Sequence, residues 1–300
     1  MSGPAPIRWR RAVGADLRAL ELFLRSDEEK RVGFSGRLIH EAGASLKLPS
    51  PLRGAVWLAA RASPEPRLEP VSLVGAVLCH STRLVFPIFP DADGDRDFAL
   101  LASSFSPASA IGLASDVERY RAASRREPLA TVAYRLMSRS SEAWEAATQR
   151  PAAAGPQGLV VRRARGSDLA ALLPLQEAYE IEEVLTPIHR FNGSACKASL
   201  ARSLDRQLVY LAEEGGTAVA KAATNARGFA VDQIGGVYTL PSRRGRGLAR
   251  ALMEAILDDI GSQGRRPALF VKPENVAAIA LYRGLGFEEI GDFRADYFEA

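Results

Sequence analysis

One eleven-residue pattern occurs twice in this chain, and the two copies lie 152 residues apart. Residues 10–20 read RRAVGADLRAL and residues 162–172 read RRARGSDLAAL, so eight of the eleven positions are identical. In each copy we expect a short strand to end at the basic pair and a helix to begin near Asp16 or Asp168, because an acidic residue suits the positive end of a helix dipole. Taken alone, this match could be a common strand-to-helix sequence that arose twice.

Two further matches at nearly the same shift favour a duplicated fold. Residues 57–59 (WLA) match residues 210–212 (YLA) at a shift of 153, and Phe89-Pro90 matches Leu240-Pro241 at a shift of 151. A chance match would not be expected to keep the same spacing through the chain. We therefore expect two halves with the same order of strands and helices.

The linker between the halves is expected at 150–158, which reads RPAAAGPQG and lacks hydrophobic periodicity. A length of 300 residues also suits two domains of roughly 150 residues each. We expect one domain over 1–149 and a second over 159–300.

The second half has the clearer pattern of strands and helices. An antiparallel series of strands is expected to lead into a strand-helix-strand crossover. The fold class is therefore mixed α/β, an α+β sandwich in which each domain is a mostly antiparallel sheet flanked by helices. In the second half we expect strands at 159–164, 207–213, 217–225, 229–240 and 268–272, and a strand pair over 286–299. We expect helices at 168–180, about 248–262 and 275–284, with a loop and a further helix together occupying 184–204. In the first half, Ser115 to Glu118 reads as a capping box for a helix near 116–125, and 131–136 alternates like a strand.

The segment from Ser242 to Arg250, SRRGRGLAR, has the pattern of an anion site. It follows an extended apolar run and precedes a helical pattern made by Ala249, Leu252, Met253, Ile256, Leu257 and Ile260. Unpaired N–H groups at a helix start, the helix dipole and glycines that allow close approach would together bind a phosphorylated ligand. The alternative is a solvated helix start with no ligand.

A Walker turn, a Rossmann turn and an RNA-binding repeat all fit this glycine-arginine segment less well. A Walker turn needs a lysine and a hydroxyl residue after its last glycine, and neither follows Gly247. A Rossmann turn needs a third glycine where Arg250 stands, and it opens near the first strand of its domain. RNA binding through arginine-glycine repeats is expected in disordered tails, and aromatic residues are not interleaved here.

Two motifs in order resemble the GCN5-related N-acetyltransferase (GNAT) family. The pattern Q/R-x-x-G-x-G/A matches at Ser242, Gly245 and Gly247, with Ser242 departing from the usual first residue. The pattern N-x-x-A-x-x-L-Y, followed by GF, matches at Asn275 to Tyr282 and at residues 286–287. The resemblance covers about 159–300 well and 7–138 only faintly. It implies two tandem GNAT-like domains, of which the N-terminal one is a degenerate copy.

The resemblance implies that acetyl-CoA is the co-substrate. Backbone N–H groups from Arg244 to Ala249 would hold its pyrophosphate, and backbone groups of Val237 and Thr239 would bind its pantetheine arm. Asn275 would also bond the arm, and the N–H near Tyr238 would polarise the acetyl carbonyl. The cofactor-binding set is Val237, Tyr238, Thr239, Arg243, Arg244, Gly245, Arg246, Gly247, Leu248, Ala249, Arg250, Asn275 and Tyr282.

The resemblance further implies direct attack of an amine on the acetyl carbonyl, with Tyr282 protonating the departing thiolate. The alternative for Tyr282 is a core aromatic. Asp232 is the candidate base because it is the acid of the segment 229–240, although a structural role is equally open. Glu180, Glu182 and Glu183 could face an amine or form a solvated surface. His189 is a further candidate, His40 and His80 have no visible partners, and no metal-ligand spacing appears.

The first half lacks the basic turn. Where the second half has SRRGRGL at 242–248, the first has DADGDRD at 91–97, so a formal charge of +3 is replaced by −3. An acidic loop would repel pyrophosphate. We therefore expect the first domain to shape the substrate cleft or to support the fold.

Composition limits the classes of partner. The net charge of +4 does not indicate a nucleic-acid-binding protein, and no apolar run is long enough to indicate a membrane span. Two cysteines, Cys79 and Cys196, fit a cytoplasmic protein with free thiols. The favoured function is an acetyl-CoA-dependent N-acyltransferase acting on a small-molecule or protein amine. The alternative is a non-catalytic acyl-CoA-binding or interaction protein, and a homodimer stays open.

Overall fold

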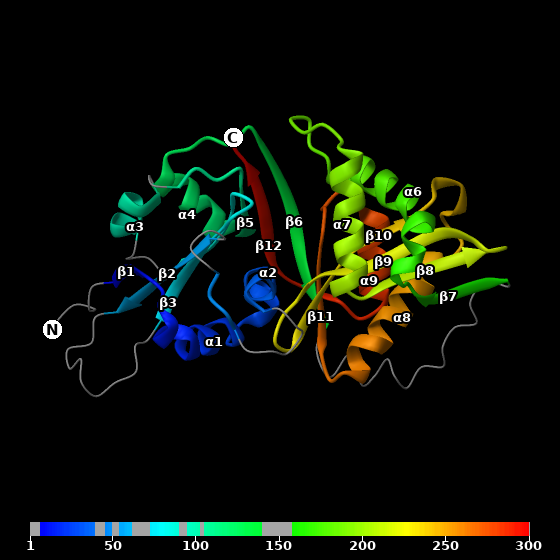
Figure 1. The fold of residues 1–300 in the computed structure, drawn as a ribbon, viewed down its shortest axis with the longest axis horizontal. Coiled ribbons are helices and arrows are strands. Elements are labelled where there is room, and N and C mark those ends of the chain that lie inside the picture. The colour runs from blue at the N-terminus through cyan, green and yellow to red at the C-terminus, as the bar shows by residue number, and fades with distance from the viewer. Residues whose placement is uncertain are drawn as a thin grey trace. The chain divides into compact units, whose positions relative to one another are not determined.

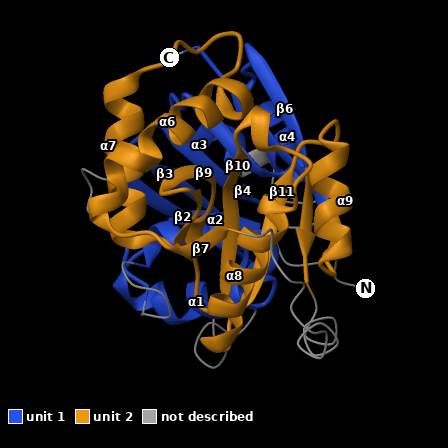
Figure 2. Cartoon of the chain, turned by 90° about the vertical axis from the view of Figure 1, so that its right-hand side faces the viewer, with its two compact units in different colours: residues 1–134, 291–300 blue, residues 135–290 orange. Residues whose placement is uncertain are grey.

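The computed structural model describes residues 7–39, 46–49, 54–61, 73–89, 95–102, 105–139 and 158–299. The chain divides into two compact units (Figure 2): unit 1 is residues 1–134 with 291–300, and unit 2 is residues 135–290. Each unit is a mostly antiparallel sheet flanked by helices, so the fold class predicted from the sequence is confirmed.

Unit 1 begins with an antiparallel series β1-β2-β3-β4, after which β4 pairs with β5 in parallel. The parallel pairing joins Leu84 to Ser109 and Val85 to Ala110. The elements of this half of the chain are β1 Ile7–Arg11, η1 Gly14–Asp16, α1 Leu17–Arg25, α2 Glu28–Leu38, β2 Gly54–Arg61, β3 Leu73–His80, β4 Leu84–Ile88, α3 Asp95–Ala102, β5 Ser109–Leu113, α4 Ala114–Ser124 and β6 Ala130–Ser138.

Unit 2 repeats this plan: β7-β8-β9-β10 is antiparallel, and β10 pairs with β11 in parallel. The elements of this second half of the chain are β7 Leu159–Arg163, η2 Gly166–Asp168, α6 Leu169–Tyr179, the π-helical turn η3 Glu180–Val184, α7 Gly193–Arg206, β8 Val209–Glu214, β9 Thr217–Arg227, β10 Val231–Thr239, η4 Pro241–Arg243, α8 Leu248–Ser262, β11 Arg266–Val271, α9 Val276–Gly284 and β12 Glu288–Tyr297.

The repeated eleven-residue pattern makes the same local structure in both halves. Arg10 forms an ion pair with Asp16, and Arg162 forms one with Asp168, at closest N–O distances of 2.5 and 2.8 Å. Each aspartate also accepts the backbone N–H of the residue three positions before it, at 2.8 Å. The carboxylate therefore fixes the entry into the first helix of each half. That the two halves arose by duplication stays a prediction.

The last strand of each half pairs within the other unit. Residues 135–138 of β6 pair antiparallel with 268–271 of β11 in unit 2. Residues 293–297 of β12 pair antiparallel with 109–113 of β5 in unit 1. The expected domains 1–149 and 159–300 differ from these two units in their bounds, and the expected division stays a prediction. Residues 150–157 of the expected linker lie outside the described residues.

Helices cover both faces of the unit 2 sheet (Figure 1). Side chains of α6 and α7 pack with Val209, Leu211 and Tyr238, whereas Leu248 and Leu252 of α8 pack with alanines of β8 and β9 on the other face. The apolar stripe predicted for α8 is buried, with Leu248 in the place expected for Ala249. Its buried members are Leu248, Leu252, Met253, Ile256, Leu257 and Ile260.

Two expected details are wrong. The capping box at Ser115 does not form, because α4 begins at Ala114 and the Asp116 carboxylate accepts the backbone N–H of Phe89 at 3.0 Å instead. The strand pair expected over 286–299 is the single strand β12. Of the acidic loop at 91–97, residues 91–94 lie outside the described residues.

Candidate active site

The glycine-arginine turn links β10 to α8 in unit 2. Gly245 and Gly247 have φ values of +76° and +78°, a conformation that side chains rarely adopt. Gly247 is the N-cap of α8, and the first helical hydrogen bond of this end runs from the N–H of Ala251 to the carbonyl of Gly247. The preceding amides therefore point toward the turn without a helical acceptor, as an anion site requires.

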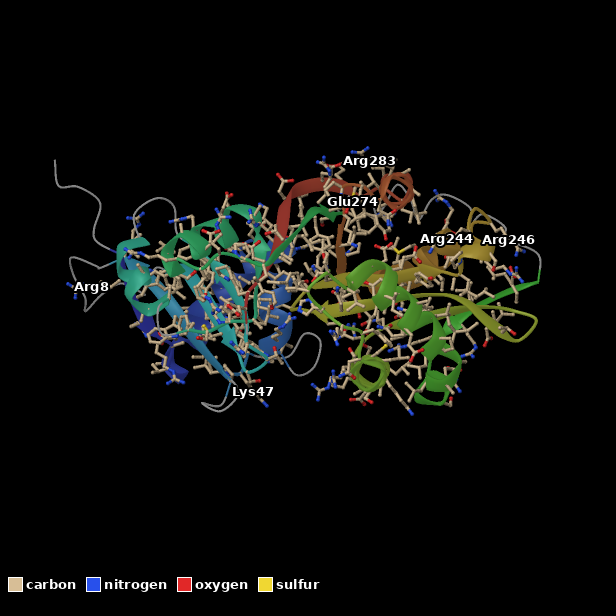
Figure 3. The ribbon with its side chains drawn as sticks, turned by 90° about the horizontal axis from the view of Figure 1, so that it is seen from above. Arg8, Lys47, Arg244, Arg246, Glu274 and Arg283 are labelled. Atoms are coloured by element: carbon tan, nitrogen blue, oxygen red, sulfur yellow. The ribbon has the colours of Figure 1, made fainter. Side chains whose placement is uncertain are left out.

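Each arginine of this turn forms an ion pair with a carboxylate. Arg243 and Arg246 share Glu214, at 2.9 and 3.0 Å, and Arg244 contacts Glu182 at 2.6 Å. Arg244 and Arg246 lie on the same side of unit 2 (Figure 3), and each side chain is 47% exposed. A phosphate can replace these carboxylates, because exposed ion pairs contribute little stability. Arg250 pairs with Glu254 within α8, at 3.5 Å.

Strand β10 has a bulge beside this turn. Gly235 pairs with Ala223 of β9 but Tyr238 pairs with Lys221, so β10 has one extra residue between the two pairs. Gly236 adopts φ +61° at this place. The pairing of β10 with β11 ends at Ile234, so the strands part where the bulge begins.

The predicted backbone contacts of the pantetheine arm, Val237 and Thr239, lie in the part of β10 that does not pair with β11. The Thr239 carbonyl accepts the Nε–H of Arg244 at 3.1 Å. Tyr238 lies between them with its side chain buried against α6, and its hydroxyl donates to Glu182 at 3.0 Å.

Two side chains hold the backbone of Gly236. Its N–H donates to the hydroxyl of Tyr179, at the end of α6. Its carbonyl accepts from Nζ of Lys221, at 2.8 Å. Lys221 is 2% exposed, and burial lowers the pKa of its amine to about 8. Neither Tyr179 nor Lys221 is predicted from the sequence, where the available signal is a lone lysine inside an alanine-rich strand.

Tyr282 lies on α9 and is 7% exposed, within the core cluster that includes Phe287. Burial raises the pKa of its hydroxyl, and the nearby Tyr179 and Glu183 raise it further. Tyr282 therefore lies close enough to Tyr179, which contacts the bulge at Gly236, for the two hydroxyl groups to affect each other's charge. Its burial agrees with the alternative of a core aromatic, and its catalytic role stays a prediction.

Asn275 is the N-cap of α9. Its side-chain oxygen accepts the N–H of Ala278 at 3.1 Å, so the first turn of the helix fixes the orientation of the amide. A side-chain amide also carries two N–H donors, which this bond does not use.

Asp232 lies at the beginning of β10, in the segment that pairs with β11 and before the bulge. It is fully buried and contacts Arg265 at 2.7 Å and Arg227 at 3.1 Å. Its catalytic role stays a prediction, and these surroundings favour a structural one.

The acidic end of α6 is a π-helical turn, Glu180–Val184. Glu182 accepts from Tyr238 and Arg244, which together hold its pKa below its usual range. Glu183 contacts Lys272 at 3.5 Å and affects the pKa of Tyr179 and Tyr282. His189 is instead bonded to Thr186, with 2.7 Å between Nδ1 and the hydroxyl oxygen.

Unit 1 has a cavity of about 330 Å³ beside β4 and β5. Its charged lining is Lys30, Arg31 and Arg119 with Asp27 and Asp116. None of the lining residues belongs to the site that the sequence predicts. Within the described ranges, no cluster of three His, Cys, Asp or Glu residues could hold a metal, and no helix is both long and apolar enough to span a membrane.

The sequence profile of the acetyltransferase (GNAT) family matches residues 176–287, from the end of α6 to the residue before β12. Mycothiol acetyltransferase of Nocardioides sp. is 27% identical over 268 residues, or 81% of this chain and 89% of that protein. N-alpha-acetyltransferase RimI of Mycobacterium tuberculosis is 36% identical over 89 residues, or 29% of this chain and 55% of that protein. An uncharacterized protein of Mycobacterium leprae is 47% identical over 60 residues, or 20% of this chain and 16% of that protein. This chain thus matches about half of the length of RimI and under a fifth of the length of the Mycobacterium leprae protein.

Solved structures share this fold over the whole chain. A Drosophila protein has a TM-score of 0.67 and 13% identity over 99% of both chains. An acetyltransferase of the GNAT family from Colwellia psychrerythraea has a TM-score of 0.52 and 11% identity, over 97% of this chain and 100% of that one. At such low identity the likeness concerns the fold alone.

Proposed function

We propose that this chain is an acetyltransferase of the GNAT family, whose profile matches residues 176–287, and that unit 2, which contains these residues, moves an acetyl group from acetyl-CoA to the nitrogen of an amine. GNAT acetyltransferases use acetyl-CoA as co-substrate. The observation that carries the proposal is the glycine-arginine turn at the start of α8, next to the place where β10 and β11 part.

The pyrophosphate of acetyl-CoA binds at this turn. The N–H groups from Gly245 to Ala249 donate hydrogen bonds to its oxygens, and the left-handed glycines allow the close approach. The N–H of Arg244, which was expected to join them, instead donates to the carbonyl of Pro241 at 3.3 Å. Arg243, Arg244 and Arg246 exchange their carboxylate partners for phosphate, which a guanidinium can bind through two parallel hydrogen bonds.

The pantetheine arm runs along β10 beyond Ile234. There the backbone of Val237 and Thr239 supplies hydrogen bonds as a neighbouring strand would. The side-chain amide of Asn275 donates to the arm while its oxygen continues to cap α9.

The reaction is a direct transfer. The amine nitrogen forms a bond to the acetyl carbon, the carbon–sulfur bond breaks, and Tyr282 gives its proton to the leaving thiolate. The raised pKa of Tyr282 keeps this proton in place at neutral pH. Backbone N–H groups at the bulge stabilise the negative charge that develops on the acetyl oxygen.

The proton of the attacking amine passes to Glu183, directly or through water. Of the acids considered from the sequence, Glu183 shares its surroundings with Tyr179 and Tyr282, whereas Asp232 is enclosed by two arginines at the other end of β10. The acceptor class stays broad, with small amines, amino acids and protein N-termini or lysines all included.

The test has a binding arm and a turnover arm. Calorimetry of the full chain with acetyl-CoA should show saturable binding, and its absence would remove the proposal. Incubation with a panel of amines, including peptides with free N-termini, should release free thiol. Tyr282→Phe should lower kcat on the order of 10- to 100-fold, because an acid catalyst contributes an effect of about this size or larger. An unchanged kcat would contradict the role of Tyr282.

A further inference from the structure

We infer that Lys221 is a positioning residue of the acetyl-transfer site, which fixes the peptide between Gly236 and Val237 and strengthens the N–H of Val237 as a hydrogen-bond donor to the acetyl oxygen. This inference rests on the proposed function. It adds a residue that neither sequence motif contains.

The first step is the contact itself. Lys221 of β9 extends across the bulge, and its Nζ donates to the carbonyl of Gly236 at 2.8 Å. The ammonium also lies 4.6 Å from the ring centre of Tyr179, whose hydroxyl accepts the N–H of the same glycine. Both polar groups of Gly236 are therefore held by side chains, and the bulge has a defined backbone orientation.

The second step concerns the neighbouring amide. In a trans peptide the C=O and N–H groups point in opposite directions. The carbonyl of Gly236 and the N–H of Val237 belong to one peptide, so fixing the carbonyl toward Lys221 directs this N–H away from Lys221. Val237 lies in the part of β10 that is left unpaired by β11, where the donor substrate is proposed to bind.

The third step is electrostatic. A cation bonded to a carbonyl polarises the whole amide, and hydrogen bonds to charged groups are stronger than neutral ones. The N–H of Val237 therefore becomes a better donor when Lys221 is charged. A preorganised donor of this kind acts on the charge that develops in the transition state, so its effect should appear in kcat more than in substrate binding.

Nζ of Lys221 lies so close to Gly236 that it would crowd a side chain at position 236. A Cβ atom on Gly236 would lie 3.0 Å from Nζ, and the φ of +61° also favours glycine. The ionisable groups that face Lys221 are Tyr179 of α6, Glu180 of the π-helical turn and Cys196 of α7. Glu180 and Cys196 favour the charged amine, but burial outweighs them and brings its pKa to about 8.

The test compares Lys221→Met and Lys221→Arg with Lys197→Met, a matched loss of an exposed lysine on α7. Lys221→Met should lower kcat about tenfold, a fraction of the loss on removing an oxyanion donor, while KM for acetyl-CoA changes little. Lys197→Met should match the wild type. Equal kcat values for Lys221→Met and the wild type would overturn the inference.

The pH profile separates positioning from simple packing. In the wild type, kcat should fall as pH rises through about 8, because Lys221 loses its charge there. This fall should be absent in Lys221→Met and also in Lys221→Arg, whose guanidinium stays charged. A fall that persists in both variants would overturn the inference. If Lys221→Met does not fold, the arginine variant alone decides.

Stability gives a readout that does not need turnover. A lowered pKa in the folded state means that folding favours the neutral amine, so this group should add stability as pH rises from about 8 toward 10. The urea midpoint of the wild type should therefore rise over this pH interval, and that of Lys221→Met should not show this rise. The absence of any difference would count against the buried charge. Failure of the wild type to turn over any amine would instead overturn the proposed function.

Discussion

Asp232 and Glu183 are carboxylates of the same unit, and we expect a structural role for Asp232 and a role as proton acceptor for Glu183. Asp232 is fully buried between Arg265 and Arg227. Asp232→Asn should leave these arginines without their counter-charge and cost about 3–5 kcal/mol of unfolding free energy. Denaturant titration measures this cost, and kcat per folded molecule should stay near the wild-type value. A large loss of kcat at full stability would restore Asp232 as the base.

Glu183 is half-buried beside Lys272 and in the surroundings of Tyr179 and Tyr282. Glu183→Gln keeps the size of the side chain but removes its basicity, so kcat should fall on the order of 10- to 100-fold at neutral pH. The exposed Glu288→Gln is the matched control and should not change the rate. The loss should shrink at high pH, where the free amine needs no base. A uniform loss across pH would point to a structural role.

At the scale of elements, the start of α8 can be tested against its end. Gly247 and Gly264 both have positive φ, and in both a Cβ atom would meet open space. Leucine at either place should cost roughly 1–2 kcal/mol through the left-handed backbone. Only Gly247→Leu should also weaken acetyl-CoA binding, because it covers the amides of the turn. Calorimetry of both variants decides, and equal affinities would contradict this use of the turn.

The elements that sequence predicted well are those whose residues show a local period. The apolar stripe of α8 and the alternation in β6 indicate a helix and a strand within a few residues of their observed bounds. The glycines of the segment 242–250 indicate its turn, because their positive φ is a local requirement.

The missed features depend on contacts between distant segments. The bulge of β10 is held by Tyr179 and Lys221, which lie 57 and 15 residues before Gly236. The π-helical turn at 180–184 likewise has no compositional mark that separates it from a helix end. Asp232 was considered as a base because sequence cannot show that Arg265, 33 residues later, encloses it.

At the scale of the whole molecule, the repeated arginine-aspartate pair makes the free energy of unfolding depend on pH in the acid range. Arg10 and Arg162 hold the pKa of Asp16 and Asp168 below the usual value, and that of Asp168 falls to about 2. The stability that these carboxylates supply is complete above their unfolded pKa of 3.8 and is lost as pH falls toward 2. The urea midpoint should therefore fall over this interval.

Asp168→Asn and Asp16→Asn should each make that decline less steep. Far-UV circular dichroism during urea titration at several pH values measures both. An unchanged slope in both variants would show that other groups govern acid unfolding.

The pairing of β6 with β11, and of β12 with β5, has a consequence for how such a gene can be cut or recombined. A fragment that begins after residue 158 would lack β6 and so expose the edge of β11, and its last strand, β12, would lack its partner β5. Exposed strand edges recruit further chains, so half-length products should associate or precipitate. Mixing the two fragments should let each supply the strand that the other lacks. We therefore expect a folded protein only when both halves are present, even where one half alone performs the chemistry.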